Sequence, residues 1–380
     1  MSNPFISFSV PSIGAAEREA VLRALDSKAV GPYGLFSRLC EARLTRETGA
    51  AQVLLTHSGT HALELAAVLA ALGPGDEVVM PSLTYSATAA AVVALGAVPV
   101  FADIRADTRN LDETQIEAAI TPRTRAVLPV HYAGVGCDMS AIQRIAARHR
   151  LLIIEDAAQA VMARYKGQIL GTFGKVGVLS FGSQKNISGG TGGALLVNDA
   201  ADVNRAEMLR DCGTDRAQFV RGEVRNFTWR DFGSAGAPSE LEAALLSAQL
   251  DRIAELTDRR LDIWRRYADG FEAIEKTGAI GCPHVPAECA HNAHLYYLVW
   301  PNIRIRDRFI GYMADAGIDC RTHFQPLHDS AAGRRWGRVS GSLAVTEATA
   351  AGLVRLPIWP DMTDEAERVI EATRAFARQM

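Results

Sequence analysis

One lysine stands where its amine could do chemistry. The stretch LSFGSQKNISGGTGG, residues 179–193, places Lys185 after an apolar run and before a glycine-rich turn, and the chain has only five lysines among 40 basic residues. A lysine amine can form a Schiff base with a carbonyl cofactor, and the glycines permit a close, unusual backbone path around it. The alternative interpretation is a solvated loop lysine.

A carboxylate follows a second apolar run. In IIEDAAQA, residues 153–160, Asp156 comes where a buried strand ends. The carboxyl ends of parallel strands form the edge at which open α/β sheets bind ligands. A carboxylate there could keep a cationic ring nitrogen protonated, because a close opposite charge favours the charged form. The alternative is that Asp156 caps a following helix.

A small polar loop precedes a strong helical pattern in HSGTHALELAA, residues 57–67. The free N–H groups and the positive dipole end at Ser58, Gly59 and Thr60 suit a phosphate. Ordinary helix capping by Ser58 or Thr60 is the alternative. In PSLTYSAT, residues 81–88, Tyr85 follows a buried strand and could stack on an aromatic ligand, although a core or surface tyrosine is commoner.

The order of these features is more informative than any one of them. A phosphate loop, an aromatic residue, a strand-end aspartate and a strand-end lysine follow one another within one segment of the chain. These are the parts that an enzyme using pyridoxal 5'-phosphate (PLP) requires.

The elements that would position these residues alternate between short strands and helices from about residue 51 to 200. Helical patterns at 61–72, 85–95 and 138–149 separate apolar runs such as VVMPSLT, VPVFADI, AVLPVHYAG and LLIIEDAA. Continuous apolar strands between helices indicate a parallel sheet covered on both faces. The fold class is therefore α/β.

The pattern changes near residue 236. Ser239 and Glu242 form a capping box, and helical periodicity then continues for about nine turns. We expect a large PLP-binding domain at 1–238, followed at 239–380 by a linking helix and a smaller C-terminal α+β domain. The second part includes the strand HLYYLVWP, a helix near 306–316 and a final helix at 363–379.

The composition excludes several classes of protein. A net charge of -3 gives no reason to expect nucleic acid or an anionic membrane as a partner, and no apolar run approaches the ~18 residues of a membrane helix. With no signal peptide and six scattered cysteines, we expect a cytoplasmic protein. The histidines His291, His294, His323 and His328 have no cysteine or carboxylate at metal spacing, so we expect no metal site.

The chain resembles the DegT/StrS-type sugar aminotransferases, which are PLP-dependent enzymes of fold type I. The resemblance covers the chain end to end and rests on SGTHALELA, GPGDEVVMPSLTYSAT, GAVPVFADI, IIEDAAQA, SFGSQKNISGGTGGALLVND, HFQPLH and LVRLPIWPDMT. Within the family, TPRTRAVLPVHYAGVGCDM and RGEVRNFTWRDFGS are most similar to the dTDP-4-amino-4,6-dideoxygalactose transaminases.

The resemblance implies roles for individual residues. Lys185 matches the lysine that holds the cofactor and then moves a proton, and Asp156 matches the partner of the pyridinium nitrogen. Gln159 matches the residue near the phenolic oxygen, and Tyr85 the ring stacked on the pyridine. The phosphate-binding positions correspond to Gly59, Thr60 and Ser180.

Two positions depart from the family pattern. Many relatives have a histidine where this chain has Gly182. The family's GxNxR segment, whose asparagine reaches the phosphate of the partner subunit, is replaced by GSAGA at residues 233–237. Ser234 or a backbone group is therefore expected to make that contact.

The resemblance implies a homodimer that transfers an amino group from L-glutamate to a nucleotide-linked keto-sugar, with pyridoxamine 5'-phosphate (PMP) formed in the half-reaction. The expected substrate is a dTDP-4-keto-6-deoxyhexose. The alternatives are a 3-keto-sugar aminotransferase, a dehydratase of the same family, in which histidine replaces the lysine, and a non-catalytic PLP-binding regulator. Arginines between residues 210 and 230 are candidates for binding the donor carboxylate or the diphosphate; they are Arg210, Arg216, Arg221, Arg225 and Arg230.

Overall fold

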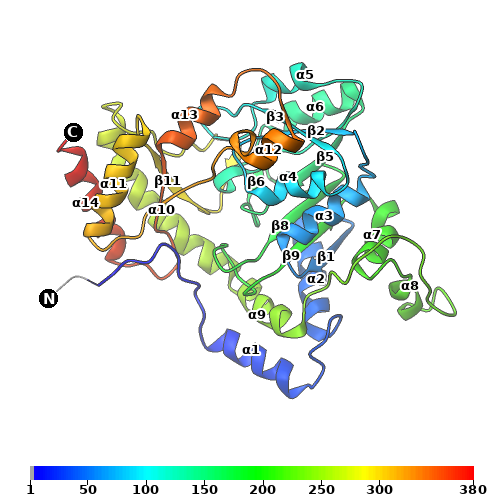
Figure 1. The fold of residues 1–380 in the computed structure, drawn as a ribbon. Helices are drawn as coiled ribbons and strands as arrows, with labels where there is room; N and C mark the ends of the chain where they lie inside the picture. Colours follow the sequence, from blue (N-terminus) through cyan, green and yellow to red (C-terminus); the bar gives the residue numbers. More distant parts are fainter. Residues whose placement is uncertain (1–3) are drawn as a thin grey trace.

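A twisted eight-stranded sheet forms the centre of the computed structural model, which describes residues 4–380 (Figure 1). In sheet order the strands are β1 (Gln52–Thr56), β9 (Gly193–Val197), β8 (Val176–Ser180), β5 (Leu152–Asp156), β4 (Thr124–Val127), β2 (Glu77–Pro81), β3 (Val98–Ala102) and β13 (Arg338–Val339). Strand β9 is antiparallel to both of its neighbours, and every other pairing in the sheet is parallel. The predicted mainly parallel sheet is confirmed.

Both faces of this sheet are covered by helices, as the apolar strands predict. Along β9, Ala194 and Leu196 belong to one hydrophobic core, and Leu195 and Val197 belong to another. The first core also takes side chains from α1 (Ala15–Asp26), α2 (Leu35–Thr48), α6 (Met139–His149) and α9 (Glu240–Asp251). The second takes them from α3 (Gly59–Leu69), α4 (Ser86–Val93) and α7 (Val203–Arg210).

The C-terminal residues build a core of their own around a three-stranded antiparallel sheet. Its strands are β11 (Tyr296–Val299), β14 (Leu353–Leu356) and β12 (Arg321–Thr322), and the helices are α10 (Ile253–Glu275), α11 (Ile303–Asp315), α13 (Ala344–Gly352) and α14 (Glu365–Ala377). The N-terminal segment joins this part, because the N–H of Ile6 donates to the carbonyl of Gly317 at 2.8 Å. The first described residues therefore pack against the turn that follows α11, and α14 ends the chain in the same part of the molecule (Figure 1).

The remaining elements are short. They are α5 (Ile116–Ala119), α8 (Arg216–Val220), α12 (Ala331–Trp336) and the small sheet β6 (Arg164–Tyr165), β7 (Gln168–Ile169) and β10 (Cys289–Ala290).

The prediction of one continuous helix of nine turns after Ser239 is wrong. Ser239 and Glu242 form the predicted capping box, but α9 ends at Asp251 and α10 begins at Ile253. Between them Arg252 has φ −104° and ψ 4°, outside the helical region, and its side chain is bonded to Glu17 at 2.9 Å. Helix α9 stays packed on α1 and α2, whereas α10 carries the chain to the C-terminal core.

The strand expected at 126–134 is also shorter than predicted. Strand β4 ends at Val127, and residues 132–134 form a turn of 3-10 helix. Pro129 has no N–H for a ladder, and Ala133 has a positive φ of 57°. The chain therefore turns over the end of the sheet, which brings Tyr132 toward the cavity described below.

A domain boundary at residue 239 stays a prediction. Elements beyond it contribute to the large sheet and its core, since Leu246 of α9 lies in the first core and β13 is an edge strand. No helix within residues 4–380 is long and apolar enough to cross a membrane. The same residues contain no group of three His, Cys, Asp or Glu side chains arranged to hold a metal ion.

Candidate active site

A cavity of about 620 Å³ lies at the carboxyl ends of the central strands, between the sheet and the C-terminal part. The candidate residues that line it are Gly59, Thr60, Tyr85, Asp156, Gln159, Ser180 and Lys185. Residues far apart in sequence thus meet where an open α/β sheet binds its ligand. Ser234 is not part of this lining.

Asp156 ends β5 and is held from two sides. Its Oδ2 accepts a hydrogen bond from Thr88 Oγ1 at 2.8 Å, and its Oδ1 accepts one from the N–H of Ala158 at 3.1 Å. The Thr88 hydroxyl is in turn 2.8 Å from Thr84 Oγ1. No helix begins after Asp156, so the aspartate does not act as the helix cap that was the alternative.

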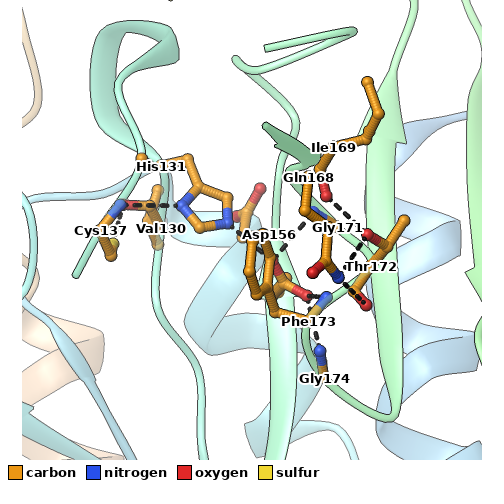
Figure 2. A network of polar contacts seen from close by, with 12 residues as sticks. Val130, His131, Cys137, Asp156, Gln168, Ile169, Gly171, Thr172, Phe173 and Gly174 are labelled. Atoms are coloured by element: carbon orange, nitrogen blue, oxygen red, sulfur yellow. Dashed lines mark hydrogen bonds and ion pairs between the residues drawn. The ribbon is translucent and has the colours of Figure 1, made fainter. Parts of the chain in front are cut away.

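The neighbouring Glu155 anchors the end of the same strand. Its carboxylate is fully buried and accepts hydrogen bonds from His131 Nε2 at 3.0 Å and from the N–H groups of Gly171, Phe173 and Gly174 at 2.9, 2.6 and 2.8 Å. Figure 2 shows His131 and the loop from Gly171 to Gly174 around this strand end. Successive side chains on a strand point to opposite faces, so anchoring Glu155 directs the carboxylate of Asp156 into the cavity.

Lys185 follows β8 on the loop 181–192. Burial lowers the pKa of its amine to about 8; Asp156 opposes this shift, and the charge of Arg355 adds to it. Half of the Lys185 amine is therefore neutral near pH 8. The other lysines do not line the cavity: Lys175 pairs with Asp202, and Lys166 Nζ bonds Ser140 Oγ at 3.0 Å.

The N-terminus of α3 offers a cradle for a phosphate. Ser58 caps the helix, since its Oγ accepts from the N–H of His61 at 3.1 Å. The first N–H groups of a helix have no partner within it, so those of Gly59 and Thr60 are available to an anion in the cavity. A Cβ on Gly59 would lie 2.8 Å from Ser180 Cβ, so glycine is needed to keep this helix end beside Ser180. Ser58 therefore caps α3, and the N–H groups of Gly59 and Thr60 can still bind a phosphate.

Gln159 is oriented by its surroundings. Its Oε1 accepts a hydrogen bond from the N–H of Ala133 at 2.7 Å. The amide oxygen is thereby occupied, which leaves the NH₂ group to donate into the cavity. This arrangement suits an acceptor such as a phenolic oxygen.

The structure places Tyr85 and Ser234 in different surroundings. Tyr85 lines the cavity at the start of α4, is 61% exposed, and has its ring centroid 6.1 Å from that of Phe324. Ser234 lies outside, where its Oγ is 3.1 Å from His61 Nε2. Gly182, at the position where many relatives have histidine, also lines the cavity. A Cβ placed on it would have no atom within 4 Å.

The C-terminal part contributes polar residues that the sequence did not single out. His323 Nδ1 is 2.6 Å from the hydroxyl of Tyr132, and His294 Nδ1 is 2.7 Å from Asn186 Oδ1. Both imidazoles line the cavity, and burial lowers the pKa of each well below its usual value. Arg355 of β14 also lines it. An arginine between apolar residues in LVRLP was the signal that could have identified Arg355.

Four of the five candidate arginines between residues 210 and 230 lie within 4.0 Å of a carboxylate of the same chain. Arg210 pairs with Glu41, Arg221 with Glu207, and Arg230 with Asp215. Arg216 lies 3.8 Å from Asp211. None of the five candidate arginines lines the cavity of its own chain, and a role for them at a subunit interface stays a prediction.

The fold defines the class of protein. The chain aligns over 99% of its length, and 98% of the other chain, with the structure named "Putative sugar aminotransferase Spr1654 from Streptococcus pneumoniae, PMP-form", at 27% identity and a TM-score of 0.91. This is the α/β fold of the PLP-dependent aminotransferases. The model of the DegT/DnrJ/EryC1/StrS aminotransferase family matches residues 11–374. The chain belongs to this aminotransferase family.

Two curated relatives are each 34% identical to this chain. The spore coat polysaccharide biosynthesis protein SpsC of Bacillus subtilis is 34% identical over 99% of this chain and 98% of its own. The GDP-perosamine synthase of Caulobacter vibrioides is 34% identical over 97% of each chain. The family resemblance noted in the sequence is confirmed.

Proposed function

We propose that this protein transfers an amino group from L-glutamate to a nucleotide-linked keto-sugar, with PLP as its cofactor. The observation that carries the proposal is the meeting of Lys185, Asp156 and the N-terminus of α3 in one cavity, in a chain of the aminotransferase family. A lone lysine, a carboxylate and an anion cradle are the protein groups that PLP chemistry requires.

The residues of the cavity fit this cofactor. Gly59, Thr60 and Ser180 would hold its phosphate, Tyr85 would cover its ring, and Gln159 would donate to its phenolic oxygen. Bound PLP would supply an electron sink for the carbon that gains or loses the amino group.

Asp156 would keep the ring nitrogen protonated. Its Oδ2 is oriented by Thr88, and a carboxylate beside a cationic nitrogen favours the protonated form. The strand anchor at Glu155 supports this role, because it fixes the position from which Asp156 acts.

Lys185 would serve both as the attachment point for the cofactor and as the base. A neutral amine is needed to take a proton from the α-carbon of the donor, and a pKa lowered to about 8 makes that form accessible. The protonated amine would return a proton to the carbon that receives the new nitrogen. The presence of lysine rather than histidine at this position argues against the dehydratase alternative.

The substrate we propose is a dTDP-4-keto-6-deoxyhexose, giving a dTDP-4-amino-4,6-dideoxyhexose. The sequence resemblance supports the C4 position and the dTDP carrier. One relative is named for a GDP-linked product, so the nucleotide is the first variable to test. The 3-keto-sugar aminotransferase is the second candidate.

We also propose that the working unit is a homodimer. Ser234 lies outside the cavity of its own chain, which is compatible with a contact from Ser234 or a nearby backbone group to the phosphate in the partner subunit. Several large apolar side chains near the N-terminus and in the segment 216–232 are exposed in the single chain.

The proposal is tested by following cofactor and product together. Purified protein should be yellow, and borohydride reduction should attach the cofactor to the peptide that contains Lys185; a label on Lys166 or Lys175 would contradict the assignment. Incubation with glutamate and either dTDP- or GDP-linked 4-keto-6-deoxyhexose should yield 2-oxoglutarate and an amino sugar, detected by mass spectrometry. Turnover on a 3-keto isomer alone would overturn the C4 position.

A further inference from the structure

One buried imidazole presents an unused nitrogen to the cavity. His294 lines the cavity and is 6% exposed. Its Nδ1 is 2.7 Å from Asn186 Oδ1, whereas its Nε2 makes no hydrogen bond with any atom of residues 4–380. This Nε2 is not one of the unpaired polar atoms in that part of the chain that are closed off from solvent. It therefore faces the open space of the cavity.

The hydrogen bonds of Asn186 determine which nitrogen of His294 carries the proton. Asn186 Nδ2 donates to the carbonyl of Asn292 at 2.6 Å, so the amide oxygen of Asn186 is the atom that faces His294. Because that oxygen only accepts, Nδ1 of the imidazole must carry the hydrogen. Burial and the charges of Lys185 and Arg260 lower the pKa of His294 well below its usual value, so the ring is neutral. Its Nε2 is then an acceptor and cannot donate.

The backbone around this imidazole is held in place. The N–H of His294 donates to Asn292 Oδ1 at 3.1 Å, and its carbonyl accepts from Arg260 Nη2 at 2.8 Å. Arg260 also donates to the carbonyls of Ala293 and Ile358, at 3.0 and 3.1 Å. Every polar group of His294 except Nε2 thus has a partner. A group that is already fixed loses little conformational freedom when a ligand binds to it.

The polar groups that suit the cofactor are mostly donors. The N–H groups of Gly59 and Thr60 and the NH₂ group of Gln159 offer hydrogens to a phosphate and a phenolic oxygen. The Nε2 of His294 needs the opposite kind of partner. Glutamate brings two carboxylates, which only accept, and its amino group is the group that is transferred. The hydroxyls of the sugar are the remaining donors near the carbon that reacts.

We propose that Nε2 of His294 accepts a hydrogen bond from the hydroxyl on C3 of the keto-sugar. This inference rests on the proposed function and names a residue that recognises the sugar. His294 lies close to Lys185, because its partner Asn186 follows Lys185 directly in the chain. The carbon that reacts, C4, must come to the amine of Lys185.

The chemistry of the sugar identifies the hydroxyl. In a 4-keto-6-deoxyhexose, C4 has two carbon neighbours. C5 carries a methyl group and the ring oxygen, neither of which can donate, so only C3 carries a hydroxyl. A site built to bond a hydroxyl disfavours the analogue that lacks it, because the buried acceptor is then left without a partner.

The experiment compares kcat/KM for two substrates, the nucleotide-linked 4-keto-6-deoxyhexose, with dTDP or GDP as carrier, and its 3-deoxy analogue. The wild type should prefer the 3-hydroxy substrate by roughly 10-fold or more. The amide of His294→Asn lies near the place of Nδ1 and can still donate to Asn186, but the acceptor at Nε2 is lost. Its preference should therefore fall to about twofold or less. The amide of His294→Gln reaches about as far as Nε2, and this variant should keep part of the preference.

Two controls separate recognition of the sugar from a structural role. His291→Asn makes the same change three residues away, at a histidine that packs on Trp264 and does not line the cavity; it should keep the wild-type preference. The first half-reaction, in which glutamate leaves as 2-oxoglutarate and bound PLP becomes PMP, involves no sugar hydroxyl. Its rate in His294→Asn should stay within about threefold of the wild type.

Three results would overturn the inference. The first is an equal loss of kcat/KM on both substrates in His294→Asn, which would make the role of His294 structural. The second is an unchanged preference in that variant. The third is an equally large loss in the glutamate half-reaction, which would assign Nε2 to Lys185 or to the amino group of the donor. If His294→Asn does not fold, as judged by its thermal transition, His294→Gln decides, and loss of its preference overturns the inference. Failure of the wild type to aminate either sugar would instead refute the proposed function.

Discussion

At the scale of single residues, the carboxylate of Asp156 is the group whose role can be separated from folding. Asp156→Asn keeps the size of the side chain, and its one amide oxygen can still accept from the N–H of Ala158 while its NH₂ group donates to the Thr88 hydroxyl. A neutral amide cannot stabilise a protonated ring nitrogen. We expect PLP binding to weaken and turnover to fall by roughly 100-fold or more, while the thermal transition stays close to that of the wild type.

Spectral titration with PLP and steady-state assay would measure the two effects of Asp156→Asn. Near-normal turnover in this variant would remove Asp156 from the mechanism. A large decrease in the temperature of the thermal transition would show that the hydrogen bonds of Asp156 contribute to the stability of the fold, so that its charge could not be tested separately.

The amine of Lys185 gives a prediction about pH. Its pKa in the folded protein is lowered to about 8, mainly by burial, so the amine is charged below that pH and neutral above it. Only the neutral amine attacks an aldehyde. The rate at which apo-protein takes up PLP should therefore rise with pH, reach half its plateau near pH 8 and level off above. A rate that keeps rising toward pH 10 would indicate an unperturbed lysine.

The sequence predicted much of the candidate site because its signals were local. A lysine before a glycine-rich turn and an aspartate at a strand end can be recognised within a few residues. Arg355, His294 and His323 were not recognised as cavity residues, because they come from the C-terminal part and reach the cavity only through tertiary packing. The carboxylate partners of Arg210 and Arg221 were not predicted for the same reason, since they are distant in sequence or not evident from it.

At the scale of elements, the end of strand β5 depends on Glu155. Replacement by glutamine would turn one acceptor oxygen into a donor that faces the N–H of Gly171 and the ring of His131. Buried donors without a partner are costly. We expect Glu155→Gln to lower the free energy of unfolding by about 3 kcal/mol and to weaken PLP binding, because Asp156 shares the strand.

The matched control for this change is Glu117→Gln. Glu117 bonds Arg148 and His149 at 2.8 and 2.9 Å on the surface, so its loss should cost less than about 1 kcal/mol. Urea denaturation of both variants would compare the two sites. Equal effects would mean that the buried network contributes no more than a surface pair.

The boundaries of helices and strands were predicted less well than their existence, because tertiary contacts decide where an element ends. Apolar runs predicted β5, β8 and β9 because each strand is buried on both sides. The break between α9 and α10 was missed, since it occurs at Arg252, a good helix former, whose side chain bonds Glu17 of α1. Strand β4 was predicted too long because the apolar residues continue past its end at Val127. The residues after Pro129 lead into the 3-10 turn at Tyr132–Gly134 and do not extend the strand.

At the scale of the whole molecule, the exposed apolar side chains predict self-association. Leu22 and Leu25 on α1, and Leu35 and Leu39 on α2, are about half exposed, and Trp229 is 79% exposed. Helices α1 and α2 lie at the edge of the molecule away from α11 and α14 (Figure 1). Apolar side chains gathered on adjacent elements mark interaction surfaces when the patch is large. A second copy of the chain is the occupant that the proposed function requires.

Light scattering should therefore give a mass near twice 40.9 kDa, which is about 82 kDa. Leu35 and Leu39 are one helical turn apart, so Leu39→Asp would place a charge beside an apolar neighbour and should raise the dimer dissociation constant by roughly 10-fold or more. Leu39→Met, which keeps the apolar volume, is the control and should leave the mass unchanged. If the site is completed by the partner subunit, PLP binding by Leu39→Asp should weaken as the protein is diluted. An active wild-type monomer at micromolar concentration would refute the dimer and the shared site together.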